Sequence, residues 1–205
     1  MQLYVVSPSP FVRKVLIVAM EVGVADQVER VSIETTPTAP DVALTRFNPI
    51  GKVPTLVTDS GTVLYDSRVI CEYLDSIQGD VRLFPSDSVD RWKALRCQAL
   101  ADGVLDAAVA IRYETVFRPE EKCWSPWVEG QMGKIHRGLD ALEDEVESFG
   151  DDVDIGTITT ACAAGYLDFR FSAEDWRRGR PNLWDWYAQF ALRGSMVATE
   201  PARLL

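Results

Sequence analysis

Ser9 stands where a side-chain oxygen could act on a bound anion. It precedes Pro10, and a serine followed by proline commonly starts an α-helix, where the serine oxygen caps free N–H groups. A helix start carries partial positive charge and favours anions. No base is visible to make this serine a nucleophile, but its hydroxyl could donate a hydrogen bond to a thiolate. Together with the helix end, that would lower the thiol pKa by about one to two units. Helix capping alone is the alternative explanation.

A second candidate is the stretch NPIGKVP at positions 48–54. A proline that opens a strand after a glycine turn is a candidate for a cis peptide bond, and an ordinary trans proline on an edge strand is the alternative. The cis form would expose the backbone N–H and C=O of Val53 at a sheet edge. An extended peptide could pair with these groups as an added strand.

Asp66 and Ser67 form the third candidate, after a strand and at the start of a helix. Both residue types are good helix caps, and capping alone could account for them. As a binding site, the hydroxyl and backbone N–H of Ser67 could hold a carboxylate at the helix end, while Asp66 takes an ammonium group. This pair would suit the zwitterionic end of a γ-glutamyl peptide.

The elements predicted for the first 78 residues place all three candidates at element ends. Alternating and β-branched residues predict strands at 2–6, 28–33, 54–58 and 62–64, and helical spacing predicts helices at 11–22, 41–47 and 66–77. The order β-α-β-α-β-β-α predicts a small mixed sheet covered by helices. We therefore expect a thioredoxin-like domain over residues 1–78.

The pattern changes after a short linker at 78–85, and nothing beyond it resembles a strand. Amphipathic stretches at 89–116, 125–149, 154–171 and 182–192 have the spacing of helices. Residues 86–205 are therefore expected to form a separate all-helical bundle domain.

The composition excludes several classes of partner and site. Asp and Glu outnumber Lys and Arg by 31 to 21, and the resulting net charge of -10 disfavours nucleic acid and anionic membranes. No signal peptide or membrane-spanning run is apparent, and the four cysteines are scattered, so we expect reduced thiols in the cytoplasm. A single histidine, His136, argues against a metal site and against Ser-His-Asp chemistry.

Taken together, the three segments resemble the N-terminal domain of glutathione S-transferases. The matching residues are SPFVRK at 9–14, NPxGKVP at 48–54 and LYDSxxIxEYL at 64–74. The likeness is closest to serine-type bacterial members, and the helical second part is also similar to that family. The resemblance implies glutathione as co-substrate without a metal, a helical domain that shapes a pocket for a hydrophobic electrophile, and a homodimer.

The same resemblance assigns roles to individual residues. Ser9 matches the residue that contacts the glutathione sulfur, and Val53 matches the residue whose backbone pairs with the cysteinyl unit. Asp66 and Ser67 match the pair that holds the γ-glutamyl end. The remaining residues assigned to the glutathione site are Phe11, Lys52 and Pro54. No clear match exists for the basic residue that grips the glycyl carboxylate, and Lys52 could substitute for it. Ser7 is a nearby alternative to Ser9.

Three further features follow from the resemblance to the helical domain. Asp102 is similar to an acidic residue that reaches the partner subunit's glutathione in some classes. Tyr113 and Phe117 lie one helical turn apart where the family places its hydrophobic site, although such pairs are commonly core residues. Asp154 matches a helix cap, but Thr157 replaces the usual Asp, and its hydroxyl could still bond back to the cap N–H.

The resemblance favours a glutathione transferase that conjugates glutathione to a small hydrophobic electrophile. A glutathione-dependent isomerase and a non-catalytic interaction protein on the same fold are the alternatives. A thiol-disulfide reductase would need a cysteine where Ser9 stands. The identity of the electrophile cannot be read from the sequence.

Overall fold

A computed structural model describes residues 1–77 and 82–201 of the chain. The chain divides into two compact units. The first unit comprises Met1–Ser86 together with the chain from Arg193 onward, and the second comprises Asp87–Leu192. Residues 78–81, in which the predicted linker begins and the predicted first domain ends, lie outside the described residues.

The first unit contains the predicted small mixed sheet. Its strands are β1 (Gln2–Val5), β2 (Glu29–Ser32), β3 (Thr55–Val57) and β4 (Val63–Leu64), and its helices are α1 (Pro10–Glu21), α2 (Val42–Phe47) and α3 (Ser67–Ile77), with a 3-10 turn η1 (Ala25–Gln27). The sheet order is β2-β1-β3-β4, in which β1 and β2 are parallel and the other neighbours are antiparallel. The predicted order β-α-β-α-β-β-α is therefore confirmed.

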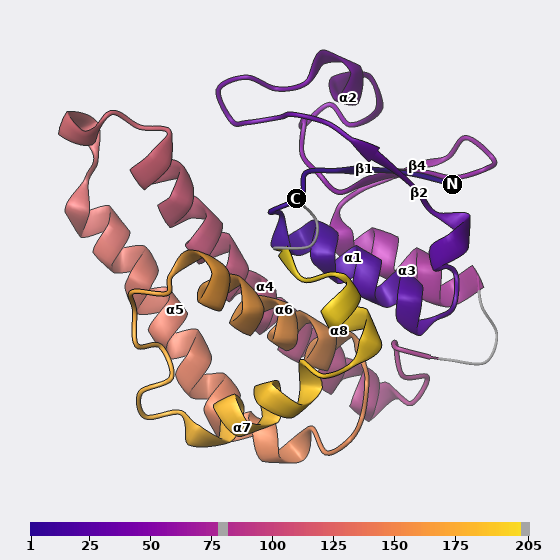
Figure 1. The fold of residues 1–205 in the computed structure, drawn as a ribbon. Helices are drawn as coiled ribbons and strands as arrows, with labels where there is room; N and C mark the ends of the chain where they lie inside the picture. Colours follow the sequence, from indigo (N-terminus) through magenta and orange to yellow (C-terminus); the bar gives the residue numbers. More distant parts are fainter. Residues whose placement is uncertain (78–81, 202–205) are drawn as a thin grey trace. The chain divides into compact units, whose positions relative to one another are not determined.

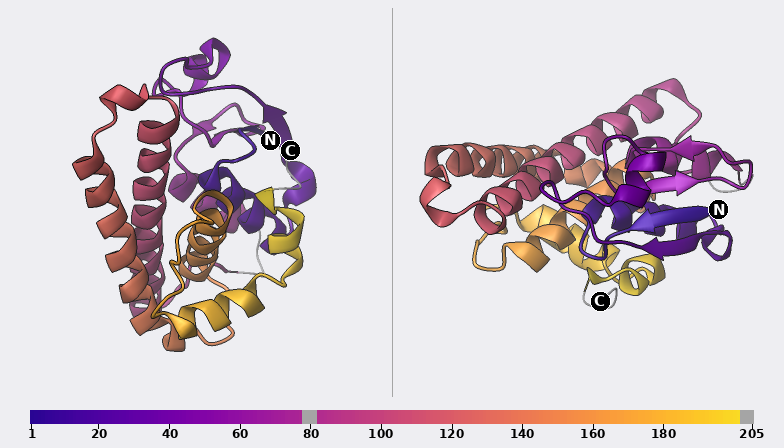
Figure 2. Two further views of the ribbon diagram at one scale, coloured as in Figure 1. Left: turned by 60° about the vertical axis from the view of Figure 1, so that its left-hand side comes forward. Right: turned by 90° about the horizontal axis from the view of Figure 1, so that it is seen from above.

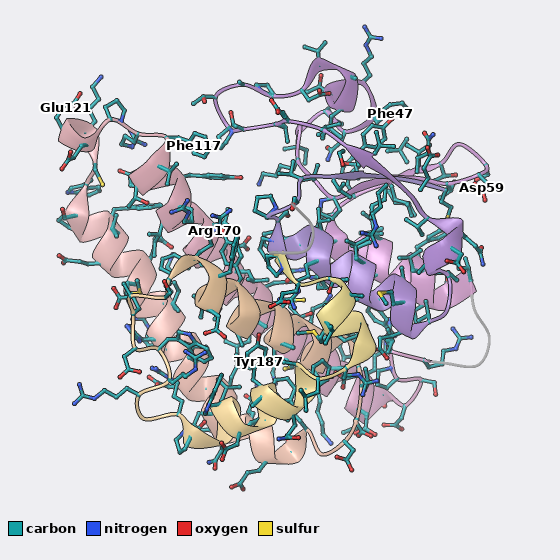
Figure 3. All side chains as sticks on the ribbon, viewed as in Figure 1. Phe47, Asp59, Phe117, Glu121, Arg170 and Tyr187 are labelled. Carbon is teal, nitrogen blue, oxygen red and sulfur yellow. The ribbon has the colours of Figure 1, made fainter. Side chains whose placement is uncertain are left out.

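Helices cover both faces of this sheet. Figure 1 shows α1 and α3 side by side on one face and α2 on the other. Because side chains alternate along a strand, Leu3 and Tyr4 of β1 point to opposite faces. Leu3 is completely buried, and the ring centre of Tyr4 lies 5.3 Å from that of Phe47, which ends α2 and is labelled in Figure 3. The sheet is thus fixed on both sides, which holds the ends of its strands in place.

The end of the described chain packs with the first unit, although the sequence analysis assigned residues 86–205 to the helical domain. The guanidinium of Arg193 donates hydrogen bonds of 3.1 and 2.9 Å to the two carboxylate oxygens of Glu21, and the Ser195 hydroxyl also donates to Glu21. Burial acts to raise the pKa of Glu21, but these hydrogen bonds outweigh it and hold the pKa below its usual value. Arg13 of α1 donates to the carbonyl of Met196 in α8 (Gly194–Ala198), so side chains of α1 bind this segment.

The second unit contains helices and no strand among its described residues, as predicted. Its elements are α4 (Ser88–Val116), η2 (Glu120–Lys122), α5 (Ser125–Glu145), η3 (Val146–Ser148), α6 (Ile155–Arg170) and α7 (Pro181–Phe190). Figure 2 shows α4 and α5 running side by side. Helix α4 also packs against α6, which is buried continuously from Ile155 to Leu167. In the described part of the chain, no helix is both long and apolar enough to cross a membrane.

The four cysteines form no disulfide. Cys97 of α4 is buried and within 3.4 Å of the Thr160 hydroxyl of α6. Burial raises the pKa of the Cys97 thiol to about 11, so this thiol stays protonated and unreactive at neutral pH.

Helix α6 begins with the capping box that the sequence analysis expected from Asp154 and Thr157. The Asp154 carboxylate accepts a hydrogen bond of 2.8 Å from the Thr157 N–H, and the Thr157 hydroxyl accepts one of 2.9 Å from the Asp154 N–H. Threonine therefore replaces the usual carboxylate without loss of the reciprocal pair. Burial raises the pKa of Asp154 more than the hydrogen bonds from Thr157 and Gly156 lower it.

We expect Asp154→Ala to lower the free energy of unfolding by about 1–2 kcal/mol and Asp154→Asn to change it by less than about 0.5 kcal/mol at pH 7. Asparagine keeps the accepting oxygen and buries no charge. Because the folded chain binds the Asp154 proton more tightly than the unfolded chain, wild-type stability should fall relative to Asp154→Asn as the pH rises above about 4. Urea denaturation of both variants from pH 3 to pH 7 measures this. If Asp154→Ala and Asp154→Asn lower the free energy of unfolding equally, the side-chain oxygen that accepts from Thr157 does not stabilise α6.

Candidate functional site

The three candidate segments meet at one end of the sheet. Strand β3 runs antiparallel to both neighbours, with Leu56 opposite Leu3 of β1 on one side and Leu64 of β4 on the other. Neighbouring strands lie about 4.8 Å apart. The end of β1, the start of β3 and the end of β4 therefore lie at the same end of the sheet, and the segments with Ser9, Val53 and Asp66 adjoin these strand ends in the chain. The pairing of these strands could not be predicted from the sequence, but it brings together the three segments that were candidates on sequence grounds.

Ser9 caps α1 at this end of the sheet. Its hydroxyl oxygen accepts a hydrogen bond of 3.3 Å from the Val12 N–H, and its own N–H donates to the Val6 carbonyl at 3.0 Å. The capping role is therefore confirmed. Since the oxygen acts as an acceptor in the cap, the hydroxyl hydrogen is available for donation to a bound group.

Val53 precedes β3 at this same end of the sheet. The peptide bond between Val53 and Pro54 is cis. Among the described residues, neither the N–H nor the C=O of Val53 has a hydrogen-bond partner. Pro54 is buried, and Thr55 next to it begins β3. An unpaired donor and acceptor at the end of a strand is the arrangement to which an extended peptide can add.

Asp66 caps α3, the second helix that begins at this end of the sheet. One Asp66 carboxylate oxygen accepts a hydrogen bond of 3.0 Å from the Arg68 N–H, and the Asp66 carbonyl accepts one from the Ile70 N–H. Ser67, the first residue of α3, is 2% exposed, whereas Asp66 is exposed. The peptide bond between Tyr65 and Asp66 is also cis. Two helices thus begin shortly after strands that end at this side of the sheet, and both N-termini favour negative charge despite the acidic composition of the chain.

The remaining predicted residues of this site differ in exposure. Phe11 is half-buried in the first turn of α1, and the Lys14 ammonium lies 5.9 Å from the centre of its ring. The Lys52 side chain is exposed, next to Val53. Binding of the glycyl carboxylate by Lys52 stays a prediction.

Polar residues with no role predicted from the sequence hold the loop before Val53. Asn48 is 1% exposed and donates hydrogen bonds to the Lys52 carbonyl and the Thr55 hydroxyl. Thr35, in the segment before α2, donates to the Gly51 carbonyl. An asparagine before proline is also a common turn residue, so the sequence offered no signal that separates this role from turn formation.

In the second unit, Tyr113 and Phe117 form an edge-to-face pair with ring centres 5.8 Å apart at the end of α4 (Figure 3). They are 45% and 46% exposed, so the alternative that they are core residues is wrong. Partial burial raises the pKa of Tyr113. Asp102, in the middle of α4, is buried, and its role toward a partner subunit stays a prediction.

Comparison with known proteins agrees with this arrangement. The model of the glutathione S-transferase N-terminal domain matches residues 8–77, and the model of the C-terminal domain matches residues 125–189. The GST-like protein YibF of Escherichia coli is 36% identical over 199 residues, which cover 95% of this chain and 96% of that protein. The chain belongs to the glutathione S-transferase family.

Solved transferase structures resemble the whole chain. A glutathione transferase family member from Pseudomonas fluorescens with bound glutathione has a TM-score of 0.95 and 45% identity and covers 98% of both chains. A second structure from that organism, with bound S-(propanoic acid)-glutathione, has a TM-score of 0.91 and 42% identity and covers 98% of this chain and 99% of its own. The thioredoxin-like and helical parts of the transferase fold are thereby confirmed.

Proposed function

We propose that this protein is a glutathione transferase that binds reduced glutathione at the end of the sheet where α1 and α3 begin. The observation that carries the proposal is that Ser9, the unpaired Val53 backbone and the start of α3 all follow or precede strand ends at the same end of the sheet. The glutathione complexes of similar family members support it.

The γ-glutamyl and cysteinyl units of glutathione each have matching groups at this site. The γ-glutamyl ammonium pairs with the Asp66 carboxylate, and the γ-glutamyl carboxylate accepts hydrogen bonds from the hydroxyl and N–H of Ser67 at the N-terminus of α3. The cysteinyl N–H and C=O pair with the C=O and N–H of Val53. Phe11, Lys52 and Pro54 complete the surface around the tripeptide.

Ser9 acts on the sulfur. Its hydroxyl donates a hydrogen bond to the thiolate while its oxygen continues to accept from the Val12 N–H. A hydrogen bond to a charged group contributes about 1.5–3 kcal/mol, and the helix end adds up to about 1 kcal/mol. The thiol proton leaves to solvent, and the sulfur lone pair forms a bond to an electrophilic carbon, whose leaving group departs with its electron pair.

The same proposal extends to the second substrate, the oligomeric state, the location and the domain boundaries of the protein. The second substrate is a small hydrophobic electrophile, and the exposed aromatic pair Tyr113 and Phe117 supports an aromatic-lined site in the second unit. We also propose a homodimer in the cytoplasm, with domain boundaries close to residues 78 and 86. No metal takes part in this chemistry.

Calorimetry with reduced glutathione tests the proposal. We expect saturable binding at or below millimolar concentration, and at least tenfold weaker binding of the dipeptide Cys-Gly, which lacks the unit assigned to Asp66 and Ser67. A panel of electrophiles, together with a cis-trans isomerisation assay, then separates conjugation from isomerisation. Glutathione binding without turnover of any panel member would favour the non-catalytic alternative, and absence of binding at millimolar glutathione would reject the proposal.

A further inference from the structure

The carbonyl of Lys52 is held by two buried side chains. The amide nitrogen of Asn48 donates a hydrogen bond of 3.0 Å to this carbonyl, and the Thr55 hydroxyl donates one of 2.9 Å to it. The same Asn48 nitrogen also donates to the Thr55 hydroxyl oxygen at 3.1 Å. Asn48 and Thr55 are 1% and 0% exposed. The carbonyl is therefore fixed from two sides by groups that are themselves bonded to each other.

The turn before Lys52 depends on the same asparagine. The Asn48 side-chain oxygen accepts a hydrogen bond of 3.1 Å from the Ile50 N–H, and its backbone carbonyl accepts one of 2.8 Å from the Gly51 N–H. Gly51 has a φ of 64°, a conformation that favours glycine. Asn48 thus uses its side-chain nitrogen, its side-chain oxygen and its carbonyl to bind Ile50, Gly51, Lys52 and Thr55.

The fixed carbonyl determines the direction of the Val53 N–H. The peptide bond between Lys52 and Val53 is trans, so its C=O and N–H point in opposite directions. Because the Lys52 carbonyl points at buried Asn48 and Thr55, the Val53 N–H points away from them. This N–H has no partner among the described residues.

We propose that Asn48 and Thr55 are positioning residues that aim the Val53 N–H at the peptide backbone of the bound thiol substrate. This inference rests on the proposed glutathione site. Neither side chain touches the ligand; both act through the Lys52 carbonyl. A donor that is already oriented loses no further freedom on binding, so the network raises affinity for the tripeptide. The Val53 N–H holds the cysteinyl backbone equally before and during the reaction, so its orientation acts on binding rather than on the chemical step.

Thr55→Val tests this, because valine keeps the branched shape and removes the hydroxyl. We expect Kd and KM for glutathione to rise about five- to tenfold, with kcat within about twofold of the wild type. In two-dimensional NMR of the ligand-free protein, the Val53 amide resonance should shift. Thr55→Ser restores a hydroxyl and should return both readouts toward wild-type values. Asn48→Asp removes the donors while keeping the side-chain oxygen, and should weaken binding in the same direction.

Thr58→Val is the matched control. The Thr58 hydroxyl is buried near the other end of β3, where it accepts a hydrogen bond of 3.0 Å from the Thr62 N–H in the hairpin. This variant should melt at a lower temperature yet bind glutathione as the wild type does. If the wild type binds glutathione and Thr55→Val binds it equally, the inference is wrong while the glutathione site stands. If the wild type does not bind glutathione, the proposed function fails and the inference with it.

Discussion

Ser9→Ala should yield a folded protein that binds glutathione but ionises its thiol at a higher pH. The structure adds one cost: the Ser9 oxygen caps α1 through the Val12 N–H, so alanine should also lower the free energy of unfolding by about 1 kcal/mol. Loss of the hydrogen bond to the thiolate removes about 1.5–3 kcal/mol of its stabilisation, which raises the thiol pKa by about one to two units.

The change in pKa predicts the pH dependence of the rate. In Ser9→Ala the thiol form of bound glutathione is favoured over the thiolate, so the rate of conjugation at pH 7 should fall about tenfold or more. At pH 9–10 glutathione ionises in both proteins, and the two rates should converge. Ultraviolet titration of bound glutathione measures the pKa directly, and the high pKa of the Cys97 thiol keeps that group out of the titration at neutral pH.

Two further variants, Ser9→Thr and Ser7→Ala, test whether a hydroxyl at position 9 is the group that acts on the sulfur. Ser9→Thr keeps both the cap and the hydroxyl and should retain a low thiol pKa. The Ser7 hydroxyl oxygen is buried without a hydrogen-bond partner among the described residues, so Ser7→Ala should cost little stability. If Ser7→Ala, rather than Ser9→Ala, raises the pKa of the bound thiol, the sulfur is bound by Ser7 and not by Ser9. An unchanged pKa in Ser9→Ala contradicts the assigned role.

Local signals made the order of elements in the first unit predictable. Ser9 before Pro10 marked the start of α1, and the stretch between Asp59 and Gly61 marked the hairpin between β3 and β4, because caps and turns depend on a few adjacent residues. The capping box at Asp154 was predictable for the same reason. Possible roles of Ser9, Val53, Asp66 and Ser67 followed from residue type and position, the family resemblance tied them to glutathione, and these roles stay predictions.

Contacts between distant residues were not predictable from these signals. Glu21 binds Arg193, 172 positions away, and nothing around either residue indicates that pairing. The hydroxyl of Thr55 is a further case, since a threonine in a strand is ordinary and its bond to the Lys52 carbonyl depends on how the loop folds. The exposure of Tyr113 and Phe117 depends on where α4 extends beyond its neighbours, which periodicity alone does not reveal.

The tight contact between α4 and α6 at Gly156 predicts a large effect on stability. A Cβ atom added at Gly156 would lie 2.8 Å from the Cβ of Cys97 and 2.9 Å from the carbonyl oxygen of Ala94. Neither atom can move aside by rotating a side chain, so Gly156→Ala must separate two helices that pack along their length. The same Cβ would lie 3.1 Å from the carboxylate of Asp154, which caps α6.

We expect Gly156→Ala to lower the free energy of unfolding by about 1–3 kcal/mol, although alanine is the better helix former. Gly130 in α5 is the matched control, because an added Cβ there meets no atom within 4 Å. Gly130→Ala should raise the free energy of unfolding by about 0.5–1 kcal/mol through helix propensity alone. Urea denaturation of the two variants should therefore give shifts of opposite sign from one chemical change. Shifts of the same sign would mean that the contact between α4 and α6 yields more readily than its distances imply.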